Sequence, residues 1–359
     1  MKRIFAIVLC IVMALSVIAC GDKTPADNGP QTPAEKEYKL GMGIVVSMAS
    51  SKTGNAQVDA TVATVVTDAE GKIVMCRIDV AQNKMTVTDG AVDTAKTFET
   101  KMELGDRYGM AGKVDNDGNG VMKEWYEQTT AFEAYVVGKT AAEVRAIETQ
   151  FVNNHYIAVD TALLSAGCSM QITDFMEAVA KACEDAQGMT FKTAATFTLG
   201  VAAKTTAEES TAATAEAEGT VKMYTDFAAS VVADGKIIAT LNDAIQPQIK
   251  INAAGECTPA EFKGTKRELK EGYNMAPAVN YGPNYDPNND GKVLEWYLQS
   301  EAFSKHVVGM TAAEVAAMAT ATNSLGYQMT TDADLLAAGC TIQITAIKAV
   351  VAQSATNAR

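Results

Sequence analysis

Two short acidic segments carry the residue types that bind a divalent cation. They are Asp115-x-Asp117-x-Asn119-Gly120 and Asp286-x-Asn288-x-Asp290-Gly291, each ending four residues before a Glu-Trp-Tyr. Oxygen ligands at alternating positions suit Ca²⁺, and glycine permits the sharp turn. An EF-hand needs a bidentate Glu at loop position 12, where this chain has Tyr126 and Tyr297. A solvated Asx-rich turn has the same composition, so both interpretations stay open.

Aromatic and charged residues form a second recurring set. Trp125 and Trp296 are the two tryptophans of the chain, and each either stacks on a flat cofactor or belongs to the core side of a helix. A lysine and a glutamate also recur, as Lys101 with Glu103 and as Lys266 with Glu268. These pairs fit either a polar pocket or a structural ion pair.

The chain contains no complete catalytic motif. His155 and His306 occupy unrelated positions, and neither has a neighbouring Cys or His in the sequence. No nucleophile elbow, zinc-protease or nucleotide-binding pattern occurs. Five cysteines lie beyond Cys20 without a CxxC pair, and Cys168 and Cys340 are expected to be small buried residues. We therefore expect a binding protein without enzymatic activity.

These motifs belong to an internal repeat. Glu124-Trp125-Tyr126 returns as Glu295-Trp296-Tyr297 at an offset of 171 residues, and the segments around both follow in the same order. Downstream, Leu163-Leu164-x-Ala166-Gly167-Cys168-Ser169 returns as Leu335-Leu336-x-Ala338-Gly339-Cys340-Thr341. A period of this length is a domain rather than a solenoid unit. We therefore predict two tandem repeat domains, at 38–187 and 190–356.

Each repeat is predicted to be α+β, with an antiparallel hairpin first and helices after it. Strand-rich runs at 58–67 and 72–80 flank a turn, as do 221–233 and 236–241. Residues 124–137 have helical spacing. Capping boxes at Thr140 and Thr311 open the next helices, and 174–186 and 346–353 are expected to be closing helices. The polar stretch 203–219 is interpreted as an intradomain loop.

The N-terminal segment predicts export. Residues 1–19 have a basic start and a short apolar run, which indicates a signal peptide, and Val17-Ile18-Ala19-Cys20 resembles the lipobox of bacterial lipoproteins. Cys20 is then the lipidated residue that anchors the protein at the extracytoplasmic face of the cell membrane. Residues 20–37 contain the lipidated cysteine and a proline-rich flexible tether.

The mature chain is strongly acidic. The full sequence has a net charge of −13, and removing residues 1–19 makes it about −15. Such a charge argues against nucleic acid as a partner and against broad contact with anionic lipid. The membrane is expected to be contacted through the lipid anchor alone, and a ligand or surface protein partner is not identified.

The order of hairpin, central helices and final Ala-Gly-Cys-Thr-x-Gln-Ile-Thr resembles the FMN-binding domain of extracytoplasmic electron-transfer lipoproteins. In that family a hydroxyl before the last helix can carry FMN, and the matching residues are Ser169 and Thr341, beside Gly167 and Gly339. Backbone N–H groups at a helix entrance favour a phosphate. The spacing from Asp334 to Thr341 is one residue longer than in the family, and repeat one has Ala162 in place of Asp334. The resemblance implies non-covalent flavin binding, with Trp125 and Trp296 as further cofactor contacts.

Two functions follow as expectations. The first is a membrane-anchored binding lipoprotein that holds FMN and takes part in electron transfer. The alternative is a structural or adhesion-type surface module whose acidic loops bind Ca²⁺.

Overall fold

The structure is a computed structural model that describes residues 34–113, 115–275, 293–323 and 326–359. Cys20 and the signal peptide lie outside the described residues, as do Asp286, Asn288 and Asp290. The described helices are all too short or too polar to span a bilayer.

Four strands form the first sheet in the order β3-β2-β1-β6, and each neighbouring pair is antiparallel. Their bounds are β1 (Lys36–Ser47), β2 (Asn55–Thr67), β3 (Ile73–Thr86) and β6 (Met189–Thr193). The predicted hairpin is confirmed in β2 and β3. Its turn forms because the Asp68 carboxylate accepts hydrogen bonds from the N–H groups of Glu70 and Lys72. Gly71 has a φ of 76°, which glycine adopts without Cβ strain.

Two further antiparallel sheets follow. Each has three strands; the sheet with longer strands has the order β10-β9-β7, and the sheet with shorter strands has the order β12-β11-β8. Their bounds are β7 (Thr198–Thr206), β8 (Gly219–Lys222), β9 (Tyr224–Ala233), β10 (Lys236–Ile245), β11 (Gln248–Ile251) and β12 (Cys257–Pro259). The hairpin predicted around Asp234 and Gly235 is confirmed in β9 and β10. The stretch 203–219 contains the end of β7, a turn region and the first residue of β8.

Helices and short hairpins follow the strands in each half. The first half contains α1 (Lys101–Leu104), η1 (Gly105–Tyr108), α2 (Trp125–Tyr135), α3 (Ala141–Arg145), β4 (Thr149–Val152), β5 (His155–Ala158), α4 (Thr161–Ser165) and α5 (Thr173–Glu184). The second contains α6 (Lys266–Leu269), η2 (Lys270–Tyr273), α7 (Trp296–His306), α8 (Ala312–Ala316), β13 (Thr320–Thr322), β14 (Gln328–Thr330), α9 (Ala333–Ala337) and α10 (Thr345–Thr356). The capping boxes at Thr140 and Thr311 are confirmed, and Thr100 and Thr265 form two more.

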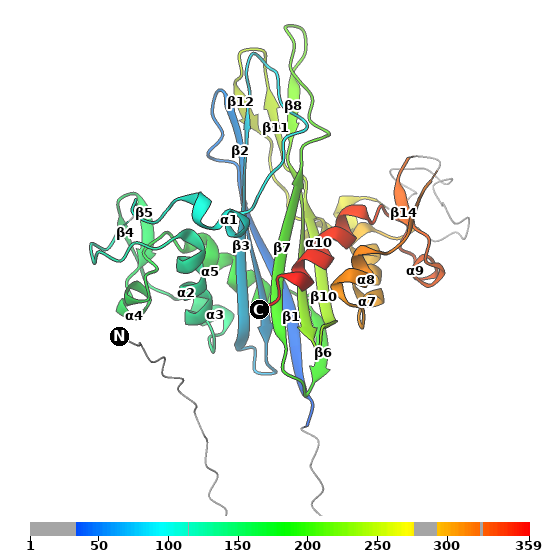
Figure 1. Ribbon diagram of the computed structural model, residues 1–359. Coiled ribbons are helices and arrows are strands. Elements are labelled where there is room, and N and C mark those ends of the chain that lie inside the picture. The colour runs from blue at the N-terminus through cyan, green and yellow to red at the C-terminus, as the bar shows by residue number, and fades with distance from the viewer. Residues whose placement is uncertain (1–33, 114, 276–292, 324–325) are drawn as a thin grey trace, which may run out of the picture. The chain divides into compact units, whose positions relative to one another are not determined.

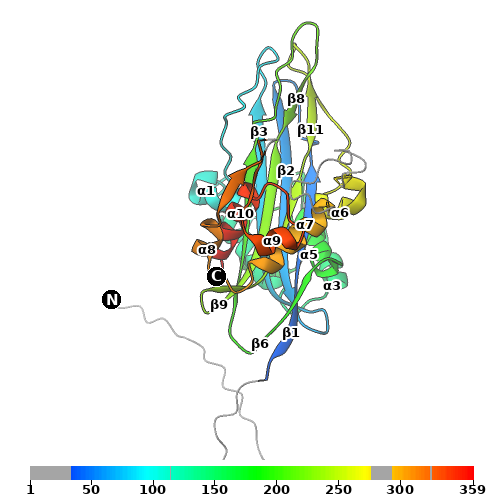
Figure 2. The same ribbon diagram turned by 90° about the vertical axis from the view of Figure 1, so that its right-hand side faces the viewer.

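The two larger sheets share one hydrophobic core. Buried side chains of both enter it, among them Leu40 and Val62 from the first sheet and Leu199 and Phe227 from the second. α5 packs on β1 and β2, and α10 packs on β7 and β9, so helices cover the outer face of each sheet (Figure 1). Figure 2 shows α7, α8, α9 and α10 in front of the second sheet. The architecture is therefore α+β with antiparallel sheets between helical layers.

The chain passes from one half to the other without a separate linker. β6 begins at Met189, next to the predicted boundary, and pairs with β1 of the first half. Residues Glu35–Arg359 accordingly form one compact unit. The predicted ranges 38–187 and 190–356 both lie within this unit.

Two glycines let the covering helices approach the strands. A Cβ on Gly41 would lie 2.0 Å from the carbonyl oxygen of Ala182 in α5, and a Cβ on Gly200 would lie 1.9 Å from that of Ser354 in α10. Glycine is required at both because the helix backbone occupies the space of a side chain.

Candidate functional site

Each half contains a pocket at the equivalent place. The first pocket has a volume of about 450 Å³ and is lined by Asp59, Gln82, Lys101, Tyr108, Trp125 and Asp174, among others. The second pocket has a volume of about 360 Å³ and is lined by Asp226, Gln246, Lys266, Tyr273, Trp296 and Ala346, among others. Both volumes are in the range of small-molecule sites.

A lysine lies over two aromatic rings in each pocket. The Nζ atom of Lys101 is 4.9 Å from the centre of the Tyr108 ring and 5.5 Å from that of Trp125. In the second pocket the Nζ atom of Lys266 is 4.9 Å from Tyr273 and 5.1 Å from Trp296. Such cation–π contacts contribute about 0.5–2 kcal/mol and restrain the ammonium group. Among the described residues neither ammonium has a hydrogen-bond acceptor or an ion-pair partner, so their N–H donors are available to a ligand.

A buried aspartate positions the short helix that carries each lysine. The Asp79 carboxylate accepts hydrogen bonds from the N–H groups of Val80 at 2.7 Å and Met102 at 3.1 Å. Burial raises the pKa of Asp79 to about 6, although these hydrogen bonds and one from Thr100 oppose the rise. Asp243 does the same in the second half, and burial also raises its pKa to about 6. Both aspartates satisfy a free N–H group in the first turn of the helix.

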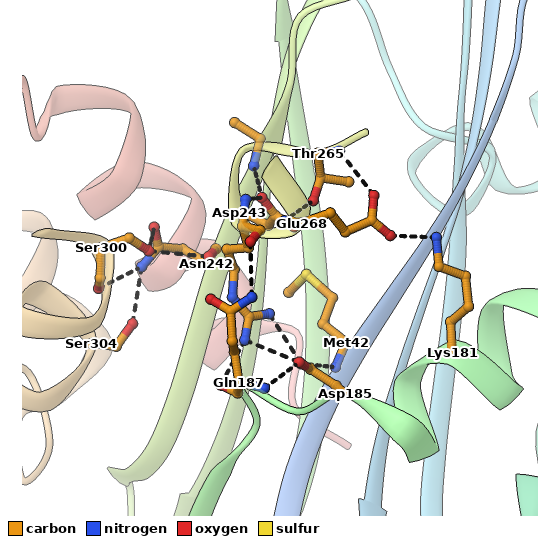
Figure 3. A network of polar contacts seen from close by, with 12 residues as sticks. Met42, Lys181, Asp185, Gln187, Asn242, Asp243, Thr265, Glu268, Ser300 and Ser304 are labelled. Carbon is orange, nitrogen blue, oxygen red and sulfur yellow. Dashed lines mark hydrogen bonds and ion pairs between the residues drawn. The ribbon is translucent and has the colours of Figure 1, made fainter. Parts of the chain in front are cut away.

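Helix α6 is also attached to the first half by a polar cluster, which we call the inter-half network and which consists of Lys181, Asp185, Gln187, Arg267 and Glu268. Figure 3 shows Lys181, Asp185, Gln187 and Glu268 of this network. The Arg267 guanidinium binds both carboxylate oxygens of Asp185, at 3.1 and 3.3 Å, and donates to the Gln187 carbonyl at 2.6 Å. Lys181 and Glu268 form an ion pair of 2.5 Å. Met102 occupies the place of Arg267 in the recurring Thr-Lys-x-Glu-Leu segment, so α1 lacks this connection.

Carboxylates face the lysine in both pockets. Desolvation raises the pKa of Asp174, the charge of Asp59 raises it further, and Lys101 opposes the rise. Burial likewise raises the pKa of Asp226, with Lys266 and Lys204 opposing it. A ligand group between the lysine and the carboxylate can accept a hydrogen bond from the ammonium or donate one to the carboxylate. None of these three aspartates was predicted as a site residue, because neither spacing nor a motif distinguishes them.

The tryptophans form the base of the pockets beneath the lysines. Trp125 and Trp296 are only 2 and 4% exposed, and Trp125 packs edge-on against Phe175 at 5.9 Å between ring centres. Both therefore belong to the core, as one of the two interpretations had it, and each also lines a pocket. Glu103 and Glu268 bind the N-cap backbone of their own helices instead of lining a pocket.

The Gly-Cys-Ser/Thr segments border the pockets, and Thr341 lines the second pocket whereas Ser169 does not line the first. Gly167 and Gly339 have φ of 89° and 88° and end the helices α4 and α9. The N–H groups of Ser169 and Met170 donate to Gln128 Oε1, and the N–H of Thr341 donates to Gln299 Oε1. Ser169 and Thr341 are 1 and 2% exposed. These N–H groups are thus already hydrogen-bonded, and the lysines supply the accessible donors.

The first acidic loop closes on itself. Asp115 accepts hydrogen bonds from the N–H groups of Gly118 and Gly120 at 2.8 and 2.9 Å, and Asn119 donates to Asp117 at 2.7 Å. These bonds lower the pKa of Asp115, with the one from Gly120 contributing most. Glu124 accepts hydrogen bonds from Met110 and Ala111 instead of facing the loop. The described part of the chain contains no group of three or more His, Cys, Asp or Glu residues that could coordinate a metal.

The histidines and cysteines add little chemistry. His155 lines the first pocket, and His306 lies 3.5 Å from Asp332. Cys168 and Cys340 are buried, as expected, and the five cysteines of the described part are unpaired.

Comparison with known proteins finds a similarity to part of the chain. A segment of 131 residues is 33% identical to a chlorophenol reductase of Desulfitobacterium hafniense. The match covers 32% of this chain and 38% of that protein. No family model matches the sequence, and no solved structure matches the fold.

Proposed function

We propose that the protein is a lipoprotein anchored through Cys20 at the extracytoplasmic face of the membrane. Its folded part consists of two tandem copies of one α+β domain. Each copy binds one small ligand. The observation that carries the binding proposal is the doubled pocket in which a lysine lies over a tyrosine and a tryptophan. The same order of helices and one short hairpin after the sheet strands of both halves supports the duplication.

FMN is the ligand that the sequence resemblance suggests, and electron transfer is the role that this cofactor would serve. The residues present fit a flavin in two respects. The pocket volumes suit a small molecule, and Lys101 and Lys266 offer ammonium donors to an anionic group such as a phosphate. The lysines replace Ser169 and Thr341 as the proposed phosphate contacts, because the backbone N–H groups of those two residues bind glutamine side chains.

The flavin proposal is tested on the mature protein exported from a flavin-replete host. Its visible absorption is measured before and after acid precipitation, and the colourless protein is titrated with FMN. We expect the flavin absorbance to be found in the supernatant after acid precipitation. In the double variant Lys101→Met with Lys266→Met, the affinity for FMN should fall at least tenfold. Lys52→Met is the matched control, because Lys52 is exposed and lines neither pocket. A protein that never takes up FMN would refute the flavin ligand.

The lipid anchor has a separate test. Mass spectrometry of the N-terminal peptide should show a diacylglyceryl-modified Cys20, and Cys20→Ser should release the protein from the membrane fraction. An unmodified mature N-terminus would contradict the anchor without affecting the pocket proposal.

A Ca²⁺-binding surface module remains a second candidate. One observation favours it: the Oδ1 atom of Asp117 is buried and has no hydrogen-bond partner among the described residues. Thermal melting is compared in Ca²⁺ and in chelator, with Asp117→Asn as the variant. A ligand that binds only the folded state raises the melting temperature, so equal midpoints would eliminate this candidate.

A further inference from the structure

The second pocket adjoins a further cavity, which we call the side cavity. The side cavity has a volume of about 330 Å³. It shares four lining residues with the second pocket, namely Ala244, Gln246, Lys266 and Tyr273. The two spaces therefore meet along one wall, and a single ligand can extend from one into the other.

Lys266 lies at the junction of the two spaces. Its Nζ atom is 4.9 Å from the centre of the Tyr273 ring and 5.1 Å from that of Trp296. The Tyr273 hydroxyl donates a hydrogen bond of 3.1 Å to Gln246 Oε1, which connects two more of the shared residues. A lysine ammonium binds a phosphate as a point charge. A phosphate group held by Lys266 would thus have space for another part of the ligand on either side.

Both spaces have a partly apolar lining that includes an aromatic side chain. The second pocket has Trp296, and the side cavity has Phe262, which is half-buried against the core shared by the sheets. Pro247 and Leu269 also line the side cavity. Ligand sites typically combine such apolar walls with a few polar groups that fix the orientation. A cation between two apolar spaces suits a ligand whose two ring systems are joined by an anionic link.

The first half has an ion pair where the second half has two glycines. Glu99 directly precedes the recurring Thr-Lys-x-Glu-Leu segment, and Arg107 directly precedes Tyr108. The Arg107 guanidinium donates to both carboxylate oxygens of Glu99, at 2.9 and 2.6 Å. At the same two places in the recurring sequence the second half has Gly264 and Gly272, and Gly264 lines the side cavity. Neither glycine has a side chain that could cover this cavity.

We propose that the second half binds a flavin dinucleotide, with the diphosphate at Lys266, one ring system in the second pocket and the other in the side cavity. The proposal deepens the proposed flavin binding and rests on it. The first half, with its ion pair between Glu99 and Arg107, is expected to bind FMN and FAD equally.

Calorimetric titration of the full-length mature protein with FMN and with FAD tests the dinucleotide. Lys101→Met leaves the second pocket as the site with its lysine, and Lys266→Met leaves the first. In Lys101→Met, FAD should bind roughly tenfold more tightly than FMN, because its adenosine part buries further apolar surface in the side cavity. In Lys266→Met the two affinities should be equal. FAD that binds no more tightly than FMN in Lys101→Met would overturn the proposal.

Variants of the side cavity locate the effect in the Lys101→Met background. Phe262→Ala should lower the affinity for FAD roughly fivefold through the lost aromatic contact and leave that for FMN unchanged. Phe98→Ala is the matched control, because Phe98 is also partly buried against the shared core and lines neither space. Gly272→Met adds an uncharged side chain of similar reach to Arg107, at a position with open space around it, and should also weaken FAD alone. Equal losses for FAD and FMN in both variants would contradict a role of the side cavity.

The titrations distinguish this proposal from the FMN hypothesis. Binding of FMN with no preference for FAD would refute the dinucleotide site and leave the FMN hypothesis intact. Binding of FAD without FMN would refute FMN as the ligand and support the dinucleotide site. Binding of neither flavin would refute both.

Discussion

Replacing Arg267 by methionine should destabilise the folded protein by about 3 kcal/mol. Met102 occupies the same place in the recurring Thr-Lys-x-Glu-Leu segment, which also forms a helix, so methionine is compatible with this local structure. The substitution removes the guanidinium that binds Asp185, and the side chains of the pair are only 8 and 9% exposed. Asp185 would then be a buried carboxylate without a counter-charge.

The magnitude follows from what remains around Asp185. Removing one partner of a buried ion pair typically costs about 3–5 kcal/mol. Asp185 would keep hydrogen bonds from the N–H groups of Met42 at 3.1 Å and Gln187 at 2.9 Å, which still stabilise its charge. The Gln187 carbonyl would lose its 2.6 Å bond from Arg267. We therefore expect the lower end of the range.

Urea unfolding at neutral pH measures the free-energy change. Adding Asp185→Asn to Arg267→Met should recover at least half of the loss, because the remaining partner is then neutral. Arg107→Met is the control, since Arg107 and Glu99 form an ion pair with 62 and 48% exposed side chains. It should change the free energy of unfolding far less than Arg267→Met does, because solvent screens an exposed ion pair. A loss below 1 kcal/mol for Arg267→Met, or no recovery in the double variant, would show that the pair does not connect the two halves.

Three further predictions concern the framework of the pockets. The pKa of Asp79 is about 6 in the folded protein, above the value in the unfolded chain, so its stabilising contribution is present below about pH 4 and is lost as pH rises through 6. Between pH 4 and 7 the free energy of unfolding of Asp79→Asn should therefore rise by up to about 3 kcal/mol relative to that of the parent. A difference in urea unfolding that does not depend on pH would contradict this. Gly41→Ala should cost about 1–3 kcal/mol or more by overpacking against α5, whereas Gly272→Ala, with open space around it, should be tolerated; calorimetry compares the two. Gln128→Ala should cost about 1–3 kcal/mol, because two buried N–H groups lose their acceptor, and unchanged urea unfolding would argue against this role.

Local structure was predictable where the signal lies within a short segment. The hairpin turn at Asp68 to Gly71 and the capping box at Thr140 depend on contacts within a few residues, so both were expected and both occur. The duplicated motifs also marked the pockets, because Lys101, Trp125 and their counterparts had been noted as recurring residues. Their spacing did not indicate whether they form a pocket, part of the core or an ion pair.

The remaining features depend on contacts between distant segments. Asp59 and Asp174 are 115 residues apart, and they share a pocket only because α5 packs on the first sheet. Arg267 has no distinguishing sequence context, and its role arises because Asp185 of the other half lies within hydrogen-bond distance. The sequence by itself indicated the two hairpins, the starts of several helices and the recurrence of the motifs, since these depend on local periodicity and repeated residues. Only the tertiary structure decided that the halves share a core and that each lysine faces carboxylates, because burial and charge proximity depend on how the sheets and helices pack.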